Sequence, residues 1–319
     1  MRLTKIFYAS DVHGSEITFR KFIGAAKLYN PNVLILGGDL TGKMITTVVQ
    51  CGDGTYTAEF LDVRHVIKDE NELRAFEKIV RDSGYYVYRT TPEGVKALAE
   101  SKDLQDKLFS ELMVQTLESW VRLAEENLRG TGIKCFVLPG NDDSYVIDEV
   151  LAKSDAVQNP EGDVVRIDES HEMISLAHAN ITPWNCPRDT QEAEIYQKIK
   201  AQAEKVQNMK NCVFNFHCPP FNSQIDLAPK LDKEFRPVMS GGEAQWAPAG
   251  SMSVRKAIEE YQPLLGVHGH IHESRGVVNI GRTTCINPGS EYGEGILRGA
   301  IINLDRDGSR VRSYQFVSG

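Results

Sequence analysis

Five short apolar segments of this chain are each followed directly by residues of the kinds that bind metal ions. These residues are Asp11 with His13, Asp39, Asn141 with Asp142, His217, and His270 with His272. Short apolar runs are typical of strands buried in a sheet, and open parallel sheets place their active sites at the carboxyl ends of such strands. The fold must therefore bring together strand ends that are spread from position 11 to position 272.

The first forty residues indicate how this sheet begins. Residues 3–9 and 33–36 predict two strands. Between them, Ser15 can cap a helix that runs to about residue 29, with an apolar stripe at helical spacing made of Ile17, Phe22, Ile23, Ala26 and Leu28. A strand, a helix and a strand in this order indicate parallel pairing through a right-handed crossover.

The rest of the chain predicts one α/β domain over 1–319 with an insertion or cap at about 44–130. In the insertion we expect a hairpin (46–50 with 55–60), a helix (70–83) and a helical region that opens at Thr91-Pro92 and runs to about 129. After it we expect strands at 134–139 and 212–216, a hairpin of 164–168 with 173–177, and a helix that Thr190 caps and that ends near 209. Residues 221–250 predict a long loop over the site and 252–262 a helix, while 277–286, 298–304 and 311–317 predict closing strands of a second sheet.

Composition excludes some classes of partner. The 319 residues carry 36 Lys and Arg against 44 Asp and Glu, a net charge of −8, so we expect no broad binding to nucleic acid and none to an anionic membrane. No apolar run approaches the ~20 residues of a membrane span, and the first residues do not resemble a signal peptide. The six cysteines form no Cys-x-x-Cys pair, which predicts a reducing, cytoplasmic location.

The histidine-rich run at 266–273 carries the strongest chemical signal. His270 and His272 are two positions apart, so in extended backbone both imidazoles point to the same side and can reach one pocket. With the other strand ends they offer imidazole, carboxylate and amide donors. This mixture suits two divalent transition-metal ions (Mn²⁺, Zn²⁺ or Fe²⁺) better than Mg²⁺ or Ca²⁺, which prefer oxygen ligands.

The order of these motifs resembles the calcineurin-like metallophosphoesterase superfamily. The segments that carry the resemblance are Asp11-Val12-His13, Gly38-Asp39, Gly140-Asn141-Asp142-Asp143, His217 and Gly269-His270-Ile271-His272, with Asn287-Pro288-Gly289-Ser290 as a later motif. They cover 1–43 and 131–304 but not the insertion. The resemblance implies a four-layer α-β-β-α sandwich of two mixed sheets flanked by helices, with the metal site at the carboxyl ends of strands.

The same resemblance implies a role for each candidate ligand. Asp11, His13 and His272 would hold one metal ion. Asn141, His217 and His270 would hold the other, with Asn141 also counted as a catalytic residue, and Asp39 would bridge the two. In this family the two ions hold a hydroxide that attacks the phosphorus of a phosphoester, so no side-chain nucleophile is needed.

One position departs from the family pattern. The residue after Gly140-Asn141 is usually a histidine that stabilises the transition state or protonates the leaving group, but here it is Asp142. A carboxylate near two dications should have a lowered pKa and be a poor acid, so we expect Asp142 to orient another group or to accept a hydrogen bond from the substrate. His268 is our candidate for the acid, while a structural role is the expectation for His178 and a surface position for His65 and His171.

The sequence therefore favours a metal-dependent phosphohydrolase, most specifically a phosphodiesterase acting on a nucleotide-type or other small phosphodiester. A phosphomonoesterase with the same binuclear site is the alternative. A metal-poor scaffold that binds proteins is disfavoured, because such relatives lose ligands and this chain keeps them. A zinc amidohydrolase barrel is disfavoured as well, because its His-x-His stands on the first strand, whereas here it comes last. We also expect that the 44–130 insertion could support a homo-oligomer.

Overall fold

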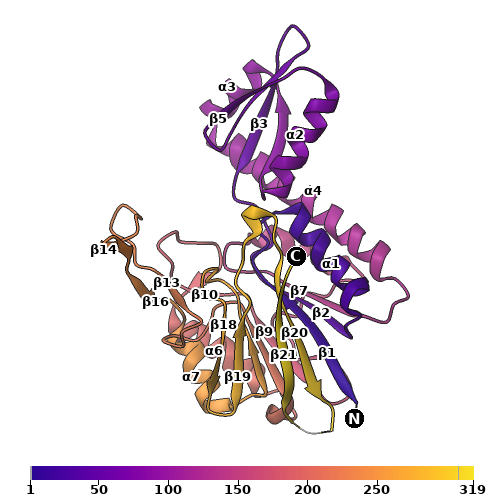
Figure 1. The fold of residues 1–319 in the computed structure, drawn as a ribbon, viewed down its shortest axis with the longest axis vertical. Coiled ribbons are helices and arrows are strands. Elements are labelled where there is room, and N and C mark those ends of the chain that lie inside the picture. Colours follow the sequence, from indigo (N-terminus) through magenta and orange to yellow (C-terminus); the bar gives the residue numbers. More distant parts are fainter. Residues whose placement is uncertain (1, 308) are drawn as a thin grey trace.

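The computed structural model describes residues 2–307 and 309–319. Two mixed sheets face each other in the body of the molecule and helices cover their outer faces, as the sequence predicted (Figure 1). The first sheet has the order β21-β20-β1-β2-β7, with bounds β1 (Leu3–Ala9), β2 (Val33–Gly37), β7 (Lys134–Leu138), β20 (Arg298–Asp305) and β21 (Val311–Ser318). The second has the order β18-β19-β17-β12-β9-β8, with bounds β8 (Val165–Arg166), β9 (Glu172–Leu176), β12 (Cys212–Phe216), β17 (Leu265–Val267), β18 (Gly276–Ile280) and β19 (Thr283–Asn287).

Alternation along the central strands explains the layers. In β1, Phe7 packs with the helix layer outside the first sheet, while its neighbour Ile6 packs between the two sheets. In β12, Val213 packs between the sheets and Phe214 packs against the helices outside the second sheet. Because successive side chains of a strand point to opposite faces, a strand covered on both faces must be apolar at nearly every position, which these strands are.

Five helices of the described residues cover the two sheets. Outside the first sheet lie α1 (Glu16–Tyr29), α4 (Lys102–Leu128) and α5 (Asp148–Ala152), and outside the second lie α6 (Glu192–Ala203) and α7 (Met252–Tyr261). None of the helices in the described residues has the length and apolar character needed to cross a membrane.

Strand direction decides where the chemistry can sit. β1 pairs in parallel with β2, and β2 with β7. In the second sheet β12 runs parallel to both β9 and β17. The carboxyl ends within each parallel set share one edge, so the segments that follow β1, β2, β7, β12 and β17 can meet.

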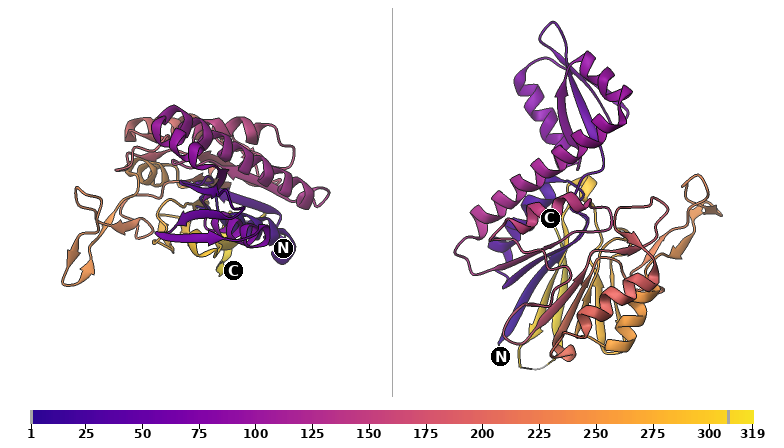
Figure 2. Two further views of the ribbon diagram at one scale, coloured as in Figure 1. Left: turned by 90° about the horizontal axis from the view of Figure 1, so that it is seen from above. Right: turned by 180° about the vertical axis from the view of Figure 1, so that it is seen from behind.

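The insertion forms a small sheet that stands off the body at the top of Figure 1 and is seen from two more sides in Figure 2. Its strand order is β5-β4-β3-β6, with β3 (Ile45–Gln50), β4 (Tyr56–Phe60), β5 (Val63–Ile67) and β6 (Tyr86–Thr90), and its helices are α2 (Glu70–Asp82) and α3 (Pro92–Glu100). The predicted hairpin and first helix are confirmed, but β5 and β6 were not predicted. The expected helical region is two helices, since Ser101 ends α3 and caps α4 with its Oγ, 3.3 Å from the amide of Leu104. An oligomer contact through this segment stays a prediction.

Four other expectations are wrong. β20 and β21 extend the first sheet rather than closing the second, because β20 pairs with β1. Gln191, not Thr190, precedes α6, and this helix ends at Ala203. Residues 221–250 are not one loop but contain two small sheets, β13 (Leu227–Pro229) with β16 (Trp246–Pro248) and β14 (Met239–Ser240) with β15 (Glu243–Ala244), and they project from the body (Figure 1). His171 is buried rather than at the surface.

The buried His171 is held by Asp168, which accepts hydrogen bonds from its amide and its Nδ1. The Asp168 carboxylate accepts hydrogen bonds from the His171 amide (2.8 Å), the His171 Nδ1 (2.8 Å) and the Thr4 hydroxyl. Thr4 lies at the start of β1. This cluster therefore joins the two sheets at the edge opposite to the one that carries the candidate ligands.

Replacing Asp168 by asparagine is expected to lower the free energy of unfolding by about 1–3 kcal/mol at pH 7. Burial by itself raises the pKa of Asp168, but the His171 and Thr4 hydrogen bonds outweigh it and hold the pKa well below its usual range. A lowered carboxyl pKa stabilises the fold above the ordinary value of about 4 and loses that effect as the pH falls. Urea denaturation should therefore show the deficit of the variant at pH 7 and a smaller one below pH ~4. Asp163→Asn, at an exposed position, should show no deficit, and an Asp168 deficit that did not change with pH would contradict the argument.

Candidate metal centre

The structure brings the five predicted segments to one edge of the sandwich. Asp11 and His13 follow β1, Asp39 follows β2, Asn141 follows β7, His217 follows β12, and His270 and His272 follow β17. Their donor atoms form two overlapping groups, one made of Asp11, His13, Asp39 and His272, the other made of Asp39, His217 and His270. Within each group the candidate ligand atoms lie within 4.8 Å of one another.

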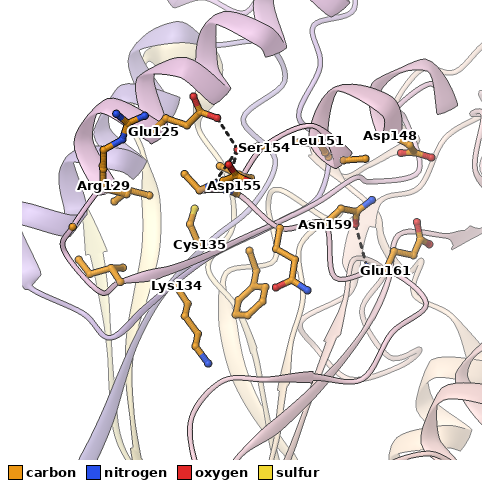
Figure 3. A pocket seen from close by; sticks show the side chains of 18 residues that line it. Glu125, Arg129, Lys134, Cys135, Asp148, Leu151, Ser154, Asp155, Asn159 and Glu161 are labelled. Carbon is orange, nitrogen blue, oxygen red and sulfur yellow. Dashed lines mark hydrogen bonds between the residues drawn. The ribbon is translucent and has the colours of Figure 1, made fainter.

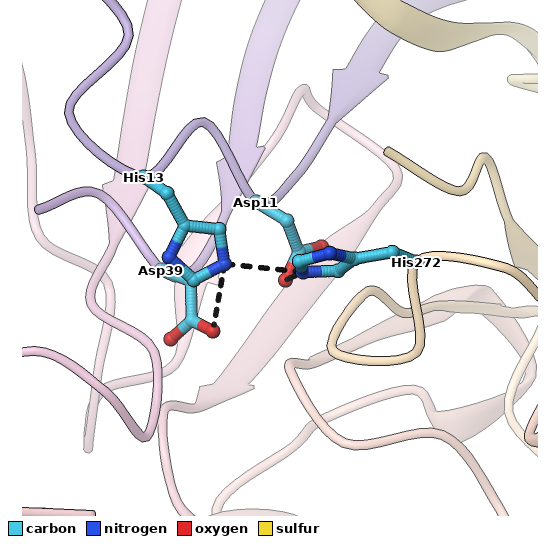
Figure 4. Close-up of side chains that lie close together, drawn as sticks. All are labelled: Asp11, His13, Asp39 and His272. Atoms are coloured by element: carbon cyan, nitrogen blue, oxygen red, sulfur yellow. Dashed lines mark hydrogen bonds and ion pairs between the residues drawn. The ribbon is translucent and has the colours of Figure 1, made fainter. Parts of the chain in front are cut away.

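The first group is drawn in Figure 4. The Nε2 atoms of His13 and His272 face each other at 3.1 Å. The His13 Nε2 lies 3.5 Å from the Asp39 Oδ2, and the His272 Nε2 lies 3.4 Å from the Asp11 Oδ1. Asp11 and His13 are almost fully buried, whereas the His272 side chain is 29% exposed. The group therefore opens to solvent on the side of His272.

The second group is centred on His217. Its Nε2 lies 3.3 Å from the Asp39 Oδ1 and 3.2 Å from the Asn141 Oδ1. The His270 ring lies close by, with its centroid 5.2 Å from that of His217. Asn141 thus joins this group through its amide oxygen.

Asp39 belongs to both groups, with one oxygen for each. Its Oδ2 faces His13 and its Oδ1 faces His217. A carboxylate placed in this way can bridge two cations, which is the role that the sequence resemblance implied for it.

The backbone at the centre is strained. Asp11, His13, Asp39 and His270 have φ angles of 58°, 39°, 51° and 65°, in the left-handed region that residues other than glycine rarely adopt. Each such residue costs roughly 1–3 kcal/mol and persists only where the surrounding structure holds it, which is common at functional sites.

These residues fit divalent metal ions. Two imidazoles meet carboxylate oxygens in each group, and the second group adds the amide oxygen of Asn141. Neutral imidazole and carboxylate are electron-pair donors that repel one another unless a proton or a cation lies between them. Burial lowers the pKa of His13 and of His270 to about 4, so both rings are neutral near pH 7. Burial raises the pKa of Asp11, but its hydrogen bond to His272 and the charge of His217 outweigh burial and lower it to about 2. The cluster can therefore hold metal ions.

Comparisons with known proteins give a sequence relative over part of the chain and solved structures of similar fold. No family model matches the chain. The uncharacterized protein MJ1162 of Methanocaldococcus jannaschii is 34% identical over 154 residues, which are 47% of this chain and 62% of that protein, so the chain matches less than two thirds of its length. One solved structure, 16% identical, has a TM-score of 0.57 over 99% of both chains. TT1561 of Thermus thermophilus, 14% identical, has a TM-score of 0.50 over 100% of this chain and 99% of that one.

The two structural likenesses extend over the whole chain, and the motif segments converge at one edge of a two-sheet sandwich. The chain has a two-sheet α-β-β-α sandwich fold, which is the fold that the sequence resemblance to the calcineurin-like metallophosphoesterases implied. Within this sandwich, the grouping of the donors matches the two sets that the sequence resemblance implied. Their binding of metal ions stays a prediction.

Residues outside the two groups orient the ligands. The His217 Nδ1 lies 2.9 Å from the Gly37 carbonyl oxygen, so Nδ1–H can donate there and Nε2 faces the cluster. Burial lowers the pKa of His217, but Asp39 and Asp11 outweigh it and raise it to about 10. The Asn141 Nδ2 donates to the Asp189 Oδ1 at 2.9 Å, which leaves the amide oxygen of Asn141 pointing at His217.

Two further residues of the centre hold its loops together. Asp143 accepts hydrogen bonds from the amides of Leu40 (2.9 Å), Thr41 (2.9 Å) and Gly140 (2.7 Å), so it joins the loops after β2 and β7. Ser290 donates its hydroxyl to the Asp11 carbonyl at 2.6 Å, and its amide donates to the His272 carbonyl at 3.1 Å. The sequence marked both residues only as parts of motifs.

Asp142 and His268 were the predicted catalytic residues besides Asn141. Asp142 lies beside the centre, with its Oδ2 3.8 Å from the His13 Nδ1. His268 is directed into the core instead: its side chain is fully buried, and its Nδ1 lies 2.9 Å from the Phe216 carbonyl and 3.2 Å from the Cys218 carbonyl. A ring enclosed in this way cannot reach a substrate, so the expectation of a general acid at His268 is wrong. His178 is bound to Glu161 at 3.0 Å, in keeping with a structural role.

A large groove lies away from the donor cluster. It has a volume of about 1250 Å³ and lies beside β7, between the end of α4 and the segment 154–161 (Figure 3). Charges of both signs line it, from Glu125, Arg129, Lys134 and Asp148, and none of the donor residues does. The metal centre is therefore not part of this groove.

Proposed function

We propose that this protein is a metal-dependent phosphoesterase, and more specifically a phosphodiesterase that acts on a nucleotide-type or other small phosphodiester. The observation that carries the proposal is Asp39, whose two oxygens face two separate groups of buried donors. Two divalent ions supply Lewis acidity and activate water for attack on phosphorus.

The chain's own residues do the rest in this proposal. Asp11, His13 and His272 hold one ion, Asn141, His217 and His270 hold the other, and Asp39 spans both. The cysteine that contacts Asp142 does not offer a nucleophile, because burial and its hydrogen bond to Asp142 raise the pKa of Cys186 to about 12, and the thiolate is the reactive form. Attack by water at a metal pair is therefore the mechanism that these residues support.

A diester is favoured because neither of the two positions considered for a general acid offers a histidine that can reach a poor leaving group. The position that carries a histidine in the resembling family is Asp142, and His268 is enclosed in the core. A phosphomonoesterase is the alternative, and a comparison of diester and monoester hydrolysis distinguishes the two.

The test is hydrolysis of bis-p-nitrophenyl phosphate and of p-nitrophenyl phosphate with Mn²⁺. We expect the diester to be hydrolysed faster and His217→Ala to abolish the reaction, since its Nε2 lies 3.2–3.3 Å from two other candidate ligands. His65→Ala, in β5 of the insertion, is the matched control and should leave the rate unchanged. Faster hydrolysis of the monoester would favour the alternative, and full activity in the His217 variant would overturn the proposal.

A further inference from the structure

Lys43 stands at the rim of the metal centre, where nothing in the sequence indicated a functional cation. It lies in the segment that leads from Asp39 to β3, at the entry to the insertion. Its ammonium forms an ion pair with the Asp142 carboxylate, and its side chain is 52% exposed. A cation is thus held beside the site and remains open to solvent.

Asp142 connects this cation to both donor groups. Its amide donates to the Asp39 Oδ1 at 3.1 Å, and its Oδ2 lies 3.8 Å from the His13 Nδ1. The Cys186 thiol donates to the Asp142 Oδ1 at 3.0 Å. One carboxylate oxygen is thus directed to Cys186 and the other to Lys43, so Asp142 acts here as an acceptor that fixes the ammonium.

The charge of Lys43 suits an anionic ligand. Burial by itself lowers the pKa of Lys43, but Asp142 and then Asp39 outweigh it and raise the pKa above its usual value. An ammonium has three donors, and the pair with Asp142 leaves donors free for a second anion. A lysine of this kind binds phosphate as a point charge.

We propose that Lys43 binds an oxygen of the substrate's phosphoryl group at the metal centre and that Asp142 is its positioning residue. The inference rests on the proposed function and deepens it. Lys43 supplies the positive charge that a histidine at position 142 would supply in the resembling family. The ammonium stabilises the negative charge that builds on the phosphoryl oxygens during attack by water.

The experiment compares Lys43→Met, Lys43→Arg and the control Lys27→Met, which lies at an exposed position of α1. Each is assayed with Mn²⁺ for metal content, for hydrolysis of bis-p-nitrophenyl phosphate and for thermal stabilisation by inorganic phosphate. We expect Lys43→Met to keep its metal, to lose about 10- to 100-fold in kcat/KM and to lose most of the stabilisation by phosphate. Lys43→Arg should recover much of both, and the control should match the parent.

Asp142→Asn separates positioning from direct binding. Because Asp142 acts through Lys43, Asp142→Asn should lower kcat/KM in the parent and have little further effect in Lys43→Met. Equal effects in both backgrounds would overturn the positioning role. Lys43→Met that keeps the parent's rate and phosphate stabilisation, or that loses its metal, would overturn the inference. A parent that binds no metal and hydrolyses neither ester would instead overturn the proposed function.

Discussion

Replacing Asp39 by asparagine is expected to cost the protein most of its bound metal and to lower phosphodiester hydrolysis by about 1,000-fold or more. Even one donor aimed at developing charge is worth roughly 100- to 1,000-fold in rate, and Asp39 is the residue whose oxygens face both donor groups. Asparagine is the informative substitution because Asp39 has a φ of 51°, which asparagine tolerates far better than alanine does. Loss of metal can then be separated from loss of the fold.

Metal content and kcat/KM should be measured on the same preparation, which has never been exposed to a chelator. Asp155→Asn is the control, since Asp155 is exposed and lines the groove beside β7 rather than the metal centre. An Asp39→Asn protein that kept two metal equivalents and a rate within tenfold of the parent would remove Asp39 as the bridging residue. If the parent protein held no metal, the alternative of a metal-poor scaffold that binds proteins would be favoured.

The donor set could be predicted from the sequence because each donor follows its strand within a few positions. A wholly apolar run such as 33–36 followed by Asp39 is a local pattern, and parallel pairing of such strands carries their ends to one edge. The assignment of donors to two groups came from the resemblance, and the distances in the structure agree with it.

What the sequence did not reveal depends on contacts between distant segments. Nothing local in residues 298–305 says that they pair with β1 rather than with the second sheet. The ion pair of Lys43 and Asp142 joins positions 99 apart (142 − 43), and Asp189 meets Asn141 only because β11 (Asp189–Thr190) lies beside that loop. His171 was predicted to lie at the surface because its hydrogen bond to Asp168 forms only in the folded turn.

The insertion is joined to the metal centre by glycine backbone. A Cβ on Gly14 would lie 2.7 Å from the Gly42 Cα and 2.8 Å from the Gly84 carbonyl oxygen. Gly14 follows the candidate ligand His13, Gly42 precedes Lys43, and Gly84 lies between α2 and β6. The Ser15 hydroxyl adds a hydrogen bond to the Asp82 carbonyl at 2.5 Å. The position of the insertion and that of His13 therefore depend on the same close contact.

Gly14→Ala is accordingly expected to lower the free energy of unfolding by about 3–5 kcal/mol. Losses of this size come from overpacking and from unusual backbone angles. Gly14 has a φ of 76°, where a side chain costs roughly 1–2 kcal/mol, and the atoms that a Cβ would meet are backbone that cannot rotate away. The matched control is Gly24→Ala in α1, where a Cβ meets nothing within 4 Å. There alanine should stabilise the protein by about 0.5–1 kcal/mol.

In urea denaturation, the midpoint of Gly14→Ala should thus lie below that of the parent and the midpoint of Gly24→Ala above it, although both variants add one methyl group. If Gly14→Ala folds, its affinity for Mn²⁺ should also fall, because the backbone of His13 must move to make room. A Gly14→Ala midpoint equal to the parent's would show that the insertion can shift without strain. The Lys43 ammonium would then not be held at a fixed distance from the donors, since Gly42, which precedes it, is one of the residues that would have to move.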